Sequence, residues 1–377
     1  MQGIIQKITA FFLSLLALLA PWRIPAAEPA EAPDYAALAQ AEADWLWTQQ
    51  LPDGAFAVYA KADGEVSVNP YFAAFTAIAL TAYDGSAQAG ERVRRYIDWH
   101  FAHLNTAEAD PNGLAGTIFD YRATVRGGAV TAEEPTGDYD STDSYAALFL
   151  RLLRDYARRY GDDALLTAHA AQIRQLVEVI FASMERGYTF SRPDYRMMYL
   201  MDNCEVYGGL CAAAELCGVI GDAALQKRVT AAVKSYERRF LTDWYRDGHF
   251  RWAMSPDEKG RFQEEAFSWD AFYPDAAAQL YPVIWGLVKP CGLPAKRVYA
   301  DCCRHWQWEK MDYREQGVSQ YYWGAFALAA AKMGDMDRLN GWLARYEQAV
   351  SPDRAWPLYC FDAAMALMAL TQAQSAP

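Results

Sequence analysis

The stretch YFAAFTAIALTAYDGSAQAGERVRRYIDWHFAHL, residues 71–104, decides the fold. Residues 71–83 carry no charged side chain and are apolar on every side of a helix. Residues 87–104 combine one apolar stripe with one charged face. A helix that is apolar all round must be buried all round, whereas an amphipathic helix lies at a surface. The link Asp84-Gly85-Ser86 contains residue types that end one helix and begin the next. The stretch therefore predicts a buried helix followed by a surface helix.

This alternation repeats along the chain, where strand signals are scarce and helical periodicity dominates. Six amphipathic helices are predicted, over residues 34–50, 87–104, 162–186, 222–241, 295–308 and 335–349. Six nearly charge-free helices are predicted, over residues 71–83, 142–153, 204–219, 275–288, 318–333 and 358–370. The pattern predicts an all-α, single-domain (α/α)6 toroid of six helical hairpins, with the charge-free helices as an inner ring. An open solenoid of helical pairs is the alternative.

The connections between the predicted helices differ in length and composition. Links from a charge-free helix to the next amphipathic helix are short and carry Gly followed by Asp, as in Gly161-Asp162 and Gly334-Asp335. Links in the other direction are long, and residues 105–140 and 244–272 form the longest. Long loops inside a compact domain are usually functional. Because these loops are rich in aromatic and acidic residues and gather at one face of a toroid, we expect a sugar-binding cleft there.

The composition excludes several classes of protein. The chain has 377 residues, 53% of them hydrophobic, and a formal net charge of -12. This apolar content excludes a disordered protein, and an acidic chain without a basic block is a poor partner for nucleic acid. We expect a monomer that binds carbohydrate and needs no cofactor. We also expect no metal site, because the pair His100 and His103 lacks an evident third ligand.

The N-terminus has the three-part pattern of a secretory signal peptide. Lys7 precedes an apolar run over residues 8–20, and Pro25-Ala26-Ala27 supplies small residues near a cleavage point. We predict a signal peptide over residues 1–27 and a catalytic domain over residues 28–377, hence a secreted or extracytoplasmic protein. An uncleaved membrane anchor is the alternative. No other membrane association is expected.

Candidate site residues stand just before or at the start of charge-free helices. Asp140 precedes one such helix and Asp143 lies in its first turn, Asp202 and Glu205 flank the start of the next, and Glu315 precedes a third. Glycoside hydrolysis needs two carboxyl groups, one to donate a proton and one to activate water or to attack directly. Helix capping is the alternative role for each acid taken singly. The predicted sugar-contacting aromatic residues are Tyr71, Tyr145, Tyr207, Trp269 and Trp323.

Two of these motifs resemble a known superfamily. The stretch Asp140-Ser-Thr-Asp143-Ser-Tyr145 resembles a sugar-binding helix start in the six-hairpin glycosidases, in the branch that contains glucosidases and debranching enzymes. The stretch Tyr199-Leu-Met-Asp202-Asn-Cys-Glu205 is similar to that branch's next landmark, where a Trp-Met-Asp motif carries the general acid. The resemblance implies that Asp202 is the acid, Asp143 a glycone ligand and Glu205 a second cleft carboxylate.

Two further similarities lie within the same superfamily. Glu315-Gln-Gly together with Tyr322-Trp323 resembles the region near the base of trehalase-like members, which implies that Glu315 is the base. A bare secreted toroid is also similar to glycoside hydrolase family 8. The acid motif of that family would fall near Tyr71, where Glu65 is the nearest carboxylate.

These observations predict a secreted glycoside hydrolase with a two-carboxylate, inverting mechanism, in which Asp202 is the acid and Glu315 the base. Two other hypotheses remain open. A polysaccharide lyase or sugar epimerase on the same toroid would use residues such as His249 and Arg251 in the loop over 244–272. A non-catalytic glycan-binding toroid would use the cleft without chemistry, because a fold does not guarantee activity.

Overall fold

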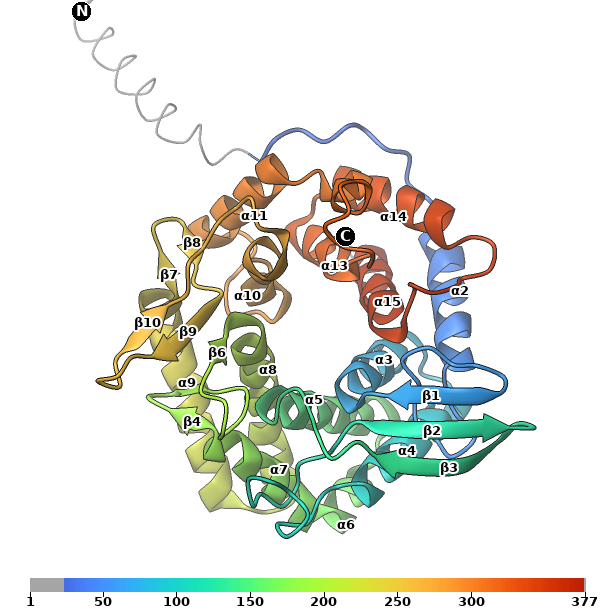
Figure 1. The fold of residues 1–377 in the computed structure, drawn as a ribbon, viewed down its shortest axis with the longest axis vertical. Coiled ribbons are helices and arrows are strands. Elements are labelled where there is room, and N and C mark those ends of the chain that lie inside the picture. Colours follow the sequence, from blue (N-terminus) through green and yellow to red (C-terminus); the bar gives the residue numbers. More distant parts are fainter. Residues whose placement is uncertain (1–23, 376–377) are drawn as a thin grey trace, which may run out of the picture.

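The computed structural model describes residues 24–375, and these form a closed ring of six helical hairpins (Figure 1). The outer helices are α2 (Tyr35–Thr48), α4 (Ala87–Ala102), α6 (Asp163–Ala168) with α7 (Ala170–Ala182), α9 (Ala223–Trp244), α11 (Leu293–His305) and α14 (Met336–Val350). The inner helices are α3 (Pro70–Tyr83), α5 (Asp143–Tyr160), α8 (Leu200–Val219), α10 (Tyr281–Ile284), α13 (Gly324–Met333) and α15 (Cys360–Gln374).

The ring closes through contacts between its first and last hairpins. Each inner helix packs against the next, in the order α3, α5, α8, α10, α13 and α15, and α15 packs against both α3 and α2. The predicted all-α toroid is therefore confirmed, and the open solenoid is excluded.

The short links behave as their residue types predict. Asp162, Asp222 and Asp335 are N-caps whose side chains accept hydrogen bonds from backbone N–H groups in the first turn of α6, α9 and α14. Gly161 and Gly334 end α5 and α13 with φ of 72° and 73°, in the left-handed region that favours glycine. Each tight turn brings the chain from the inner ring directly back to the outer ring.

Two inner helices are shorter than predicted. The segment predicted as one helix over residues 275–288 is a π-helical turn, Phe272–Ala276, followed by the single turn α10. Pro282 has no N–H group to continue a helical ladder from the preceding turn, which explains the interruption. The next inner helix begins at Gly324 rather than at residue 318. Both departures leave irregular backbone at the same face of the ring.

The long connections contain short strands that sequence periodicity did not indicate. One antiparallel sheet has the order β1 (Gly64–Val68), β2 (Tyr121–Arg126) and β3 (Ala129–Pro135). A second has the order β10 (Phe262–Glu264), β9 (Ala253–Pro256) and β6 (Met198–Tyr199). Two-residue ladders join β4 (Met184–Glu185) to β5 (Tyr188–Thr189) and β7 (Tyr245–Arg246) to β8 (His249–Phe250). The remaining short helices are η3 (Trp308–Lys310) and α12 (Asp312–Glu315).

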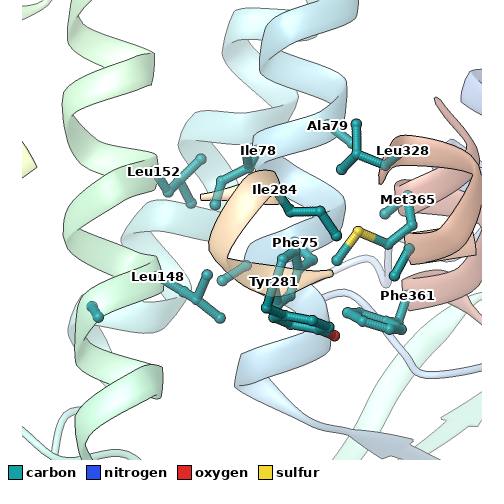
Figure 2. Close-up of a cluster of buried hydrophobic side chains, with 14 of the residues drawn as sticks. Phe75, Ile78, Ala79, Leu148, Leu152, Tyr281, Ile284, Leu328, Phe361 and Met365 are labelled. Atoms are coloured by element: carbon teal, nitrogen blue, oxygen red, sulfur yellow. The ribbon is translucent and has the colours of Figure 1, made fainter. Parts of the chain in front are cut away.

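The hydrophobic core includes buried side chains from both rings, and one part of it lies inside the inner ring, where side chains from several helices meet (Figure 2). Phe75 and Ile78 of α3 face Ile284 of α10, with Leu148 of α5 and Met365 of α15 on either side. Apolar side chains therefore meet at the centre of the ring, around a hollow of about 210 Å³.

The predicted export signal cannot be placed in this fold, because residues 1–23 lie outside the described residues. None of the helices within residues 24–375 has the length and apolar character needed to cross a membrane.

Candidate active site

A cleft with two lobes opens among the long connections. The first lobe has a volume of about 690 Å³ and is lined by Asp120, Asp138, Tyr139, Asp140, Ser191, Arg192, Tyr195, Tyr199, Met201, Asp202, Trp252, Tyr273 and Pro274. The second lobe has a volume of about 560 Å³, and its lining includes Asn69, Tyr71, Tyr145, Tyr281, Tyr321, Trp323 and Tyr359. Asp140, Met201, Asp202 and Tyr273 line both lobes, so the two acids stand where the lobes meet.

Asp202 lies in the first turn of α8 and is half-buried. Its pKa is raised well above the ordinary value, first by burial and then by the negative charges of Asp143, Glu205 and Asp140. Both effects disfavour the charged carboxylate. Asp202 is therefore suited to hold a proton at neutral pH and to donate it.

The start of α8 is fixed by Asn203, a fully buried side chain. Its Nδ2 donates to the carbonyl oxygens of Thr189 and Tyr199, at 3.0 and 2.9 Å. Its Oδ1 accepts from Thr189 N and from the Tyr236 hydroxyl, both at 2.9 Å. This amide ties the first turn of α8 to β5 and to the outer helix α9, which holds the neighbouring Asp202 in place.

Asp140 precedes α5 and is more exposed than Asp202. Burial raises the pKa of Asp140, the positive charge of Arg192 lowers it, and the negative charge of Asp138 raises it. Arg192 also forms an ion pair with Asp138, with 3.1 Å between Nη1 and Oδ1. Because Asp140 is exposed and faces a cation, it gives up its proton more readily than Asp202.

Asp143 and Glu205 are fully buried and line neither lobe. Burial is the main reason that the pKa of Asp143 rises to about 7 and that of Glu205 rises well above its usual range. The Tyr71 hydroxyl donates to Glu205 Oε1 at 2.7 Å, and the backbone N–H of Ser144 donates to Asp143 Oδ1 at 2.8 Å. The second oxygen of each carboxyl lacks a hydrogen-bond partner among the described residues.

Asp120 lines the first lobe and was not among the sequence candidates. Its Oδ1 accepts hydrogen bonds from the Tyr145 hydroxyl and from Asn69 Nδ2, both at 3.1 Å. Burial raises the pKa of Asp120 to about 6, against the opposing effect of these donors. Its place in the long loop 105–140, which was predicted to border the cleft, was the available signal.

Three predicted aromatic residues line the second lobe: Tyr71, Tyr145 and Trp323. The first lobe has its own aromatic wall, in which Tyr199 stacks on Trp252 with 6.1 Å between ring centroids. Tyr273, 57% exposed, borders both lobes. Sequence reasoning missed the aromatic wall of the first lobe and Tyr273.

Tyr207 and Trp269 do not line either lobe. Tyr207 lies two residues after Glu205, which places it on the opposite side of a helix, and its hydroxyl donates to Glu237 on the outer helix α9 at 3.2 Å. Trp269 stacks on His305 of α11, with 5.8 Å between centroids. Tyr207 and Trp269, which were predicted to contact sugar, therefore lie outside the cleft.

Glu315 is also absent from the lining of both lobes. It ends the short helix α12, is exposed, and borders a separate surface hollow together with Lys310, Arg314 and Arg345. Glu315, predicted as the base, therefore lies outside the cleft.

The residues considered for other reactions also lie outside the two lobes. His249 stacks on Phe267, with 3.9 Å between centroids, and Arg251 Nε pairs with Glu264 at 2.8 Å. Glu65 is exposed on β1 and paired in register with Thr124. Within residues 24–375, no three His, Cys, Asp or Glu side chains gather as a metal-binding group.

Comparison with solved structures shows the same fold in carbohydrate-active proteins. A wild-type glycosidase is 15% identical with a TM-score of 0.61, and the match covers 91% of this chain and 98% of that one. A variant glycosidase in complex with glucose has 16% identity, a TM-score of 0.58 and the same coverage. A beta-1,3-1,4-glucanase from Paenibacillus sp. X4 has 9% identity and a TM-score of 0.54, with 92% and 94% covered.

No family model matches the sequence, and no curated protein matches it either. At these low identities the structural similarity concerns the fold. The chain has the same helical toroid as these solved glycosidases, as the alternation of its helices predicted.

Proposed function

We propose that this protein is a secreted glycoside hydrolase in which Asp202 is the general acid. The observation that carries the proposal is the position of Asp202 at the junction of two cleft lobes, with a pKa raised by burial and by three neighbouring acids. A glycosidic oxygen at this junction has sugar units on both sides, and a protonated carboxyl beside it donates to the leaving group. The names of the solved glycosidase and glucanase with this fold support the same reaction class.

Asp140 is the proposed base. It lines both lobes with Asp202, is the more exposed of the two, and faces Arg192. A pair of acids whose surroundings separate their pKa values is the arrangement that acid–base catalysis requires. In the proposed inverting mechanism, Asp140 removes a proton from a water molecule that attacks the anomeric carbon, while Asp202 protonates the departing oxygen. Asp120, oriented by Tyr145 and Asn69, binds a sugar hydroxyl.

The proposed substrate is an uncharged glycan. The first lobe is lined by four aspartates and one arginine, and the described lining of the second lobe contains two aspartates and no lysine or arginine. Such a surface repels uronic acids and sulfated sugars. Aromatic rings in both lobes offer apolar faces on which neutral sugar rings can stack.

The test is the release of reducing ends from neutral glycans, namely β-1,3-1,4-glucan, laminarin, glucomannan, xylan and amylopectin. We expect the protein to cleave at least one of these glycans. Proton NMR of the first products should show that the configuration at the anomeric carbon is inverted. Asp140→Asn should reduce the rate by about 100-fold or more, as expected for the loss of a general base. Glu315→Gln is the matched control, since Glu315 lies outside the cleft, and it should keep full activity.

Other outcomes would contradict the proposal. Products with a new ultraviolet-absorbing double bond would indicate a lyase. Binding of a glycan without any turnover would indicate a binding protein. A retained anomeric configuration would refute the inverting mechanism but not the assignment as a hydrolase. Loss of activity in Glu315→Gln would show that Glu315 takes part in the reaction.

A further inference from the structure

Trp356 is a large aromatic side chain that lies outside the cleft and is 51% exposed. It belongs to the connection between α14 and α15, which passes beside α2 at the right of Figure 1. Its ring contacts Tyr59 edge-on, with 6.3 Å between centroids, and Tyr59 in turn lies 6.4 Å from Trp45. We call Trp356, Tyr59 and Trp45 the outer platform.

The outer platform is continuous with the second lobe of the cleft. Tyr321 and Tyr359 both line that lobe. Their ring centroids also lie 6.1 and 6.4 Å from that of Trp356. A series of aromatic rings therefore runs from the second lobe, at Tyr359 and Tyr321, to the exposed surface at Trp356.

The backbone that carries Trp356 is held firmly. Two residues earlier, Arg354 pairs with the fully buried Glu42 of α2 at 2.6 Å and with Glu347 of α14 at 3.3 Å. On the other side, the N–H of Cys360 donates to the carbonyl of Val58 at 3.0 Å, which fixes the segment carrying Tyr59. A preorganised aromatic surface loses little conformational entropy when a ligand binds. An exposed indole on such a support is the feature expected of a recognition site rather than of a core.

We infer that the outer platform is an additional binding subsite for a neutral polysaccharide chain, which continues from the second lobe across Trp356 and Tyr59. This inference rests on the proposed function and adds to it the length of the substrate. A chain that occupies both lobes and the platform is cleaved at an internal bond, so the proposed action is on polymers rather than on short oligosaccharides.

The test compares polymer and oligomer with the full chain and three variants. Trp356→Ala removes the indole, Trp356→Phe keeps an aromatic ring, and Leu241→Ala truncates an exposed apolar side chain on the outer helix α9, 44% exposed, as the matched control. Binding is followed by affinity gel electrophoresis in gels that contain β-1,3-1,4-glucan, laminarin, glucomannan, xylan or amylopectin. Turnover is followed on the polymer that is cleaved and on its tetrasaccharide. Thermal unfolding reports the integrity of each variant.

We expect Trp356→Ala to weaken polymer binding and to raise KM for the polymer by about 3- to 10-fold, the range for loss of one stacked aromatic contact. KM for the tetrasaccharide and kcat on both substrates should stay unchanged. Trp356→Phe should restore most of the affinity, and Leu241→Ala should match the wild type.

Each other outcome overturns the inference. Equal behaviour of Trp356→Ala and the wild type on polymer and tetrasaccharide would refute the subsite while leaving the hydrolase intact. Equal loss on both substrates would assign Trp356 a structural role. If the wild-type protein neither binds nor cleaves any of the five polymers, both the subsite and the proposed function are refuted.

Discussion

Gly209 on α8 marks the closest approach of two inner helices, and replacing it with alanine tests the packing that supports the site. A Cβ atom at this position would lie 2.5 Å from both Cα and Cβ of Ala147 on α5. Carbon atoms in contact normally stand 3.5–4.0 Å apart, so α5 and α8 would have to separate by about 1 Å. Because backbone lies on both sides of the contact, a change of rotamer cannot relieve it.

The expected loss of stability follows from two opposing effects. Overpacking lowers the free energy of unfolding by about 3 kcal/mol at the upper end of its usual range. Replacing glycine by alanine within a helix raises it by about 1 kcal/mol. The net loss is therefore about 2 kcal/mol. With an unfolding entropy of about 2.1 cal/mol/K per residue over roughly 350 residues, the melting temperature should fall by about 3 °C. Since Asp143 and Asp202 stand at the starts of α5 and α8, activity should fall as well.

Differential scanning calorimetry and glycan hydrolysis measure the two effects. Gly341→Ala on α14 is the matched control, because its added Cβ would meet its nearest neighbour, Glu309, at an ordinary 3.7 Å. That variant should be as stable as the wild type or more stable, and fully active. If Gly209→Ala melted at the same temperature as Gly341→Ala and kept full activity, the close helix contact would not be what holds the two acids together.

Two further predictions concern charge. Asp143→Asn removes a negative charge that raises the pKa of Asp202. The alkaline limb of the kcat/KM profile, where Asp202 loses its proton, should therefore move to lower pH. An unmoved limb would show that Asp143 does not influence the pKa of Asp202. Arg354→Met leaves Glu42 buried without its cation and should cost about 3 kcal/mol in urea unfolding at pH 8. Burial already raises the pKa of Glu42 to about 7, so near pH 5 this carboxyl is protonated and no longer an unpaired charge. The loss of stability relative to the wild type should therefore be smaller near pH 5 than at pH 8. A loss of stability that grows on acidification would contradict this reasoning.

The ring was predictable because its signal is repeated. Residues 71–83 and 87–104 show the contrast between an inner and an outer helix, and the same contrast recurs in every hairpin. What periodicity did not indicate depends on contacts between distant loops. The strand β2 pairs with β1, more than fifty residues earlier, and the fourth inner helix is interrupted where Pro282 lacks an N–H group.

Candidate site residues could be predicted where the position of a residue on a helix determines which way its side chain points. Asp140 and Asp202 precede or open consecutive inner helices, and the structure brings both to the lobe junction. Tyr207 shares a helix with Asp202 but projects toward α9 instead. Asp120 and Tyr273 reach the cleft from loops, and loop paths are determined by tertiary contacts that a single sequence does not display. Glu315 was assigned by motif alone and lies elsewhere.

In the proposed mechanism, Asp202 donates the proton to the leaving oxygen. The most direct measurement compares Asp202→Asn with the wild type on a cleaved glycan and on a glycosyl fluoride of the same sugar and anomer, whose leaving group needs no proton. We expect Asp202→Asn to lose about 100- to 10,000-fold of the rate on the glycan and little on the fluoride, with an unchanged circular dichroism spectrum. Full activity of the variant on the glycan, or an equal loss on both substrates, would contradict this mechanism.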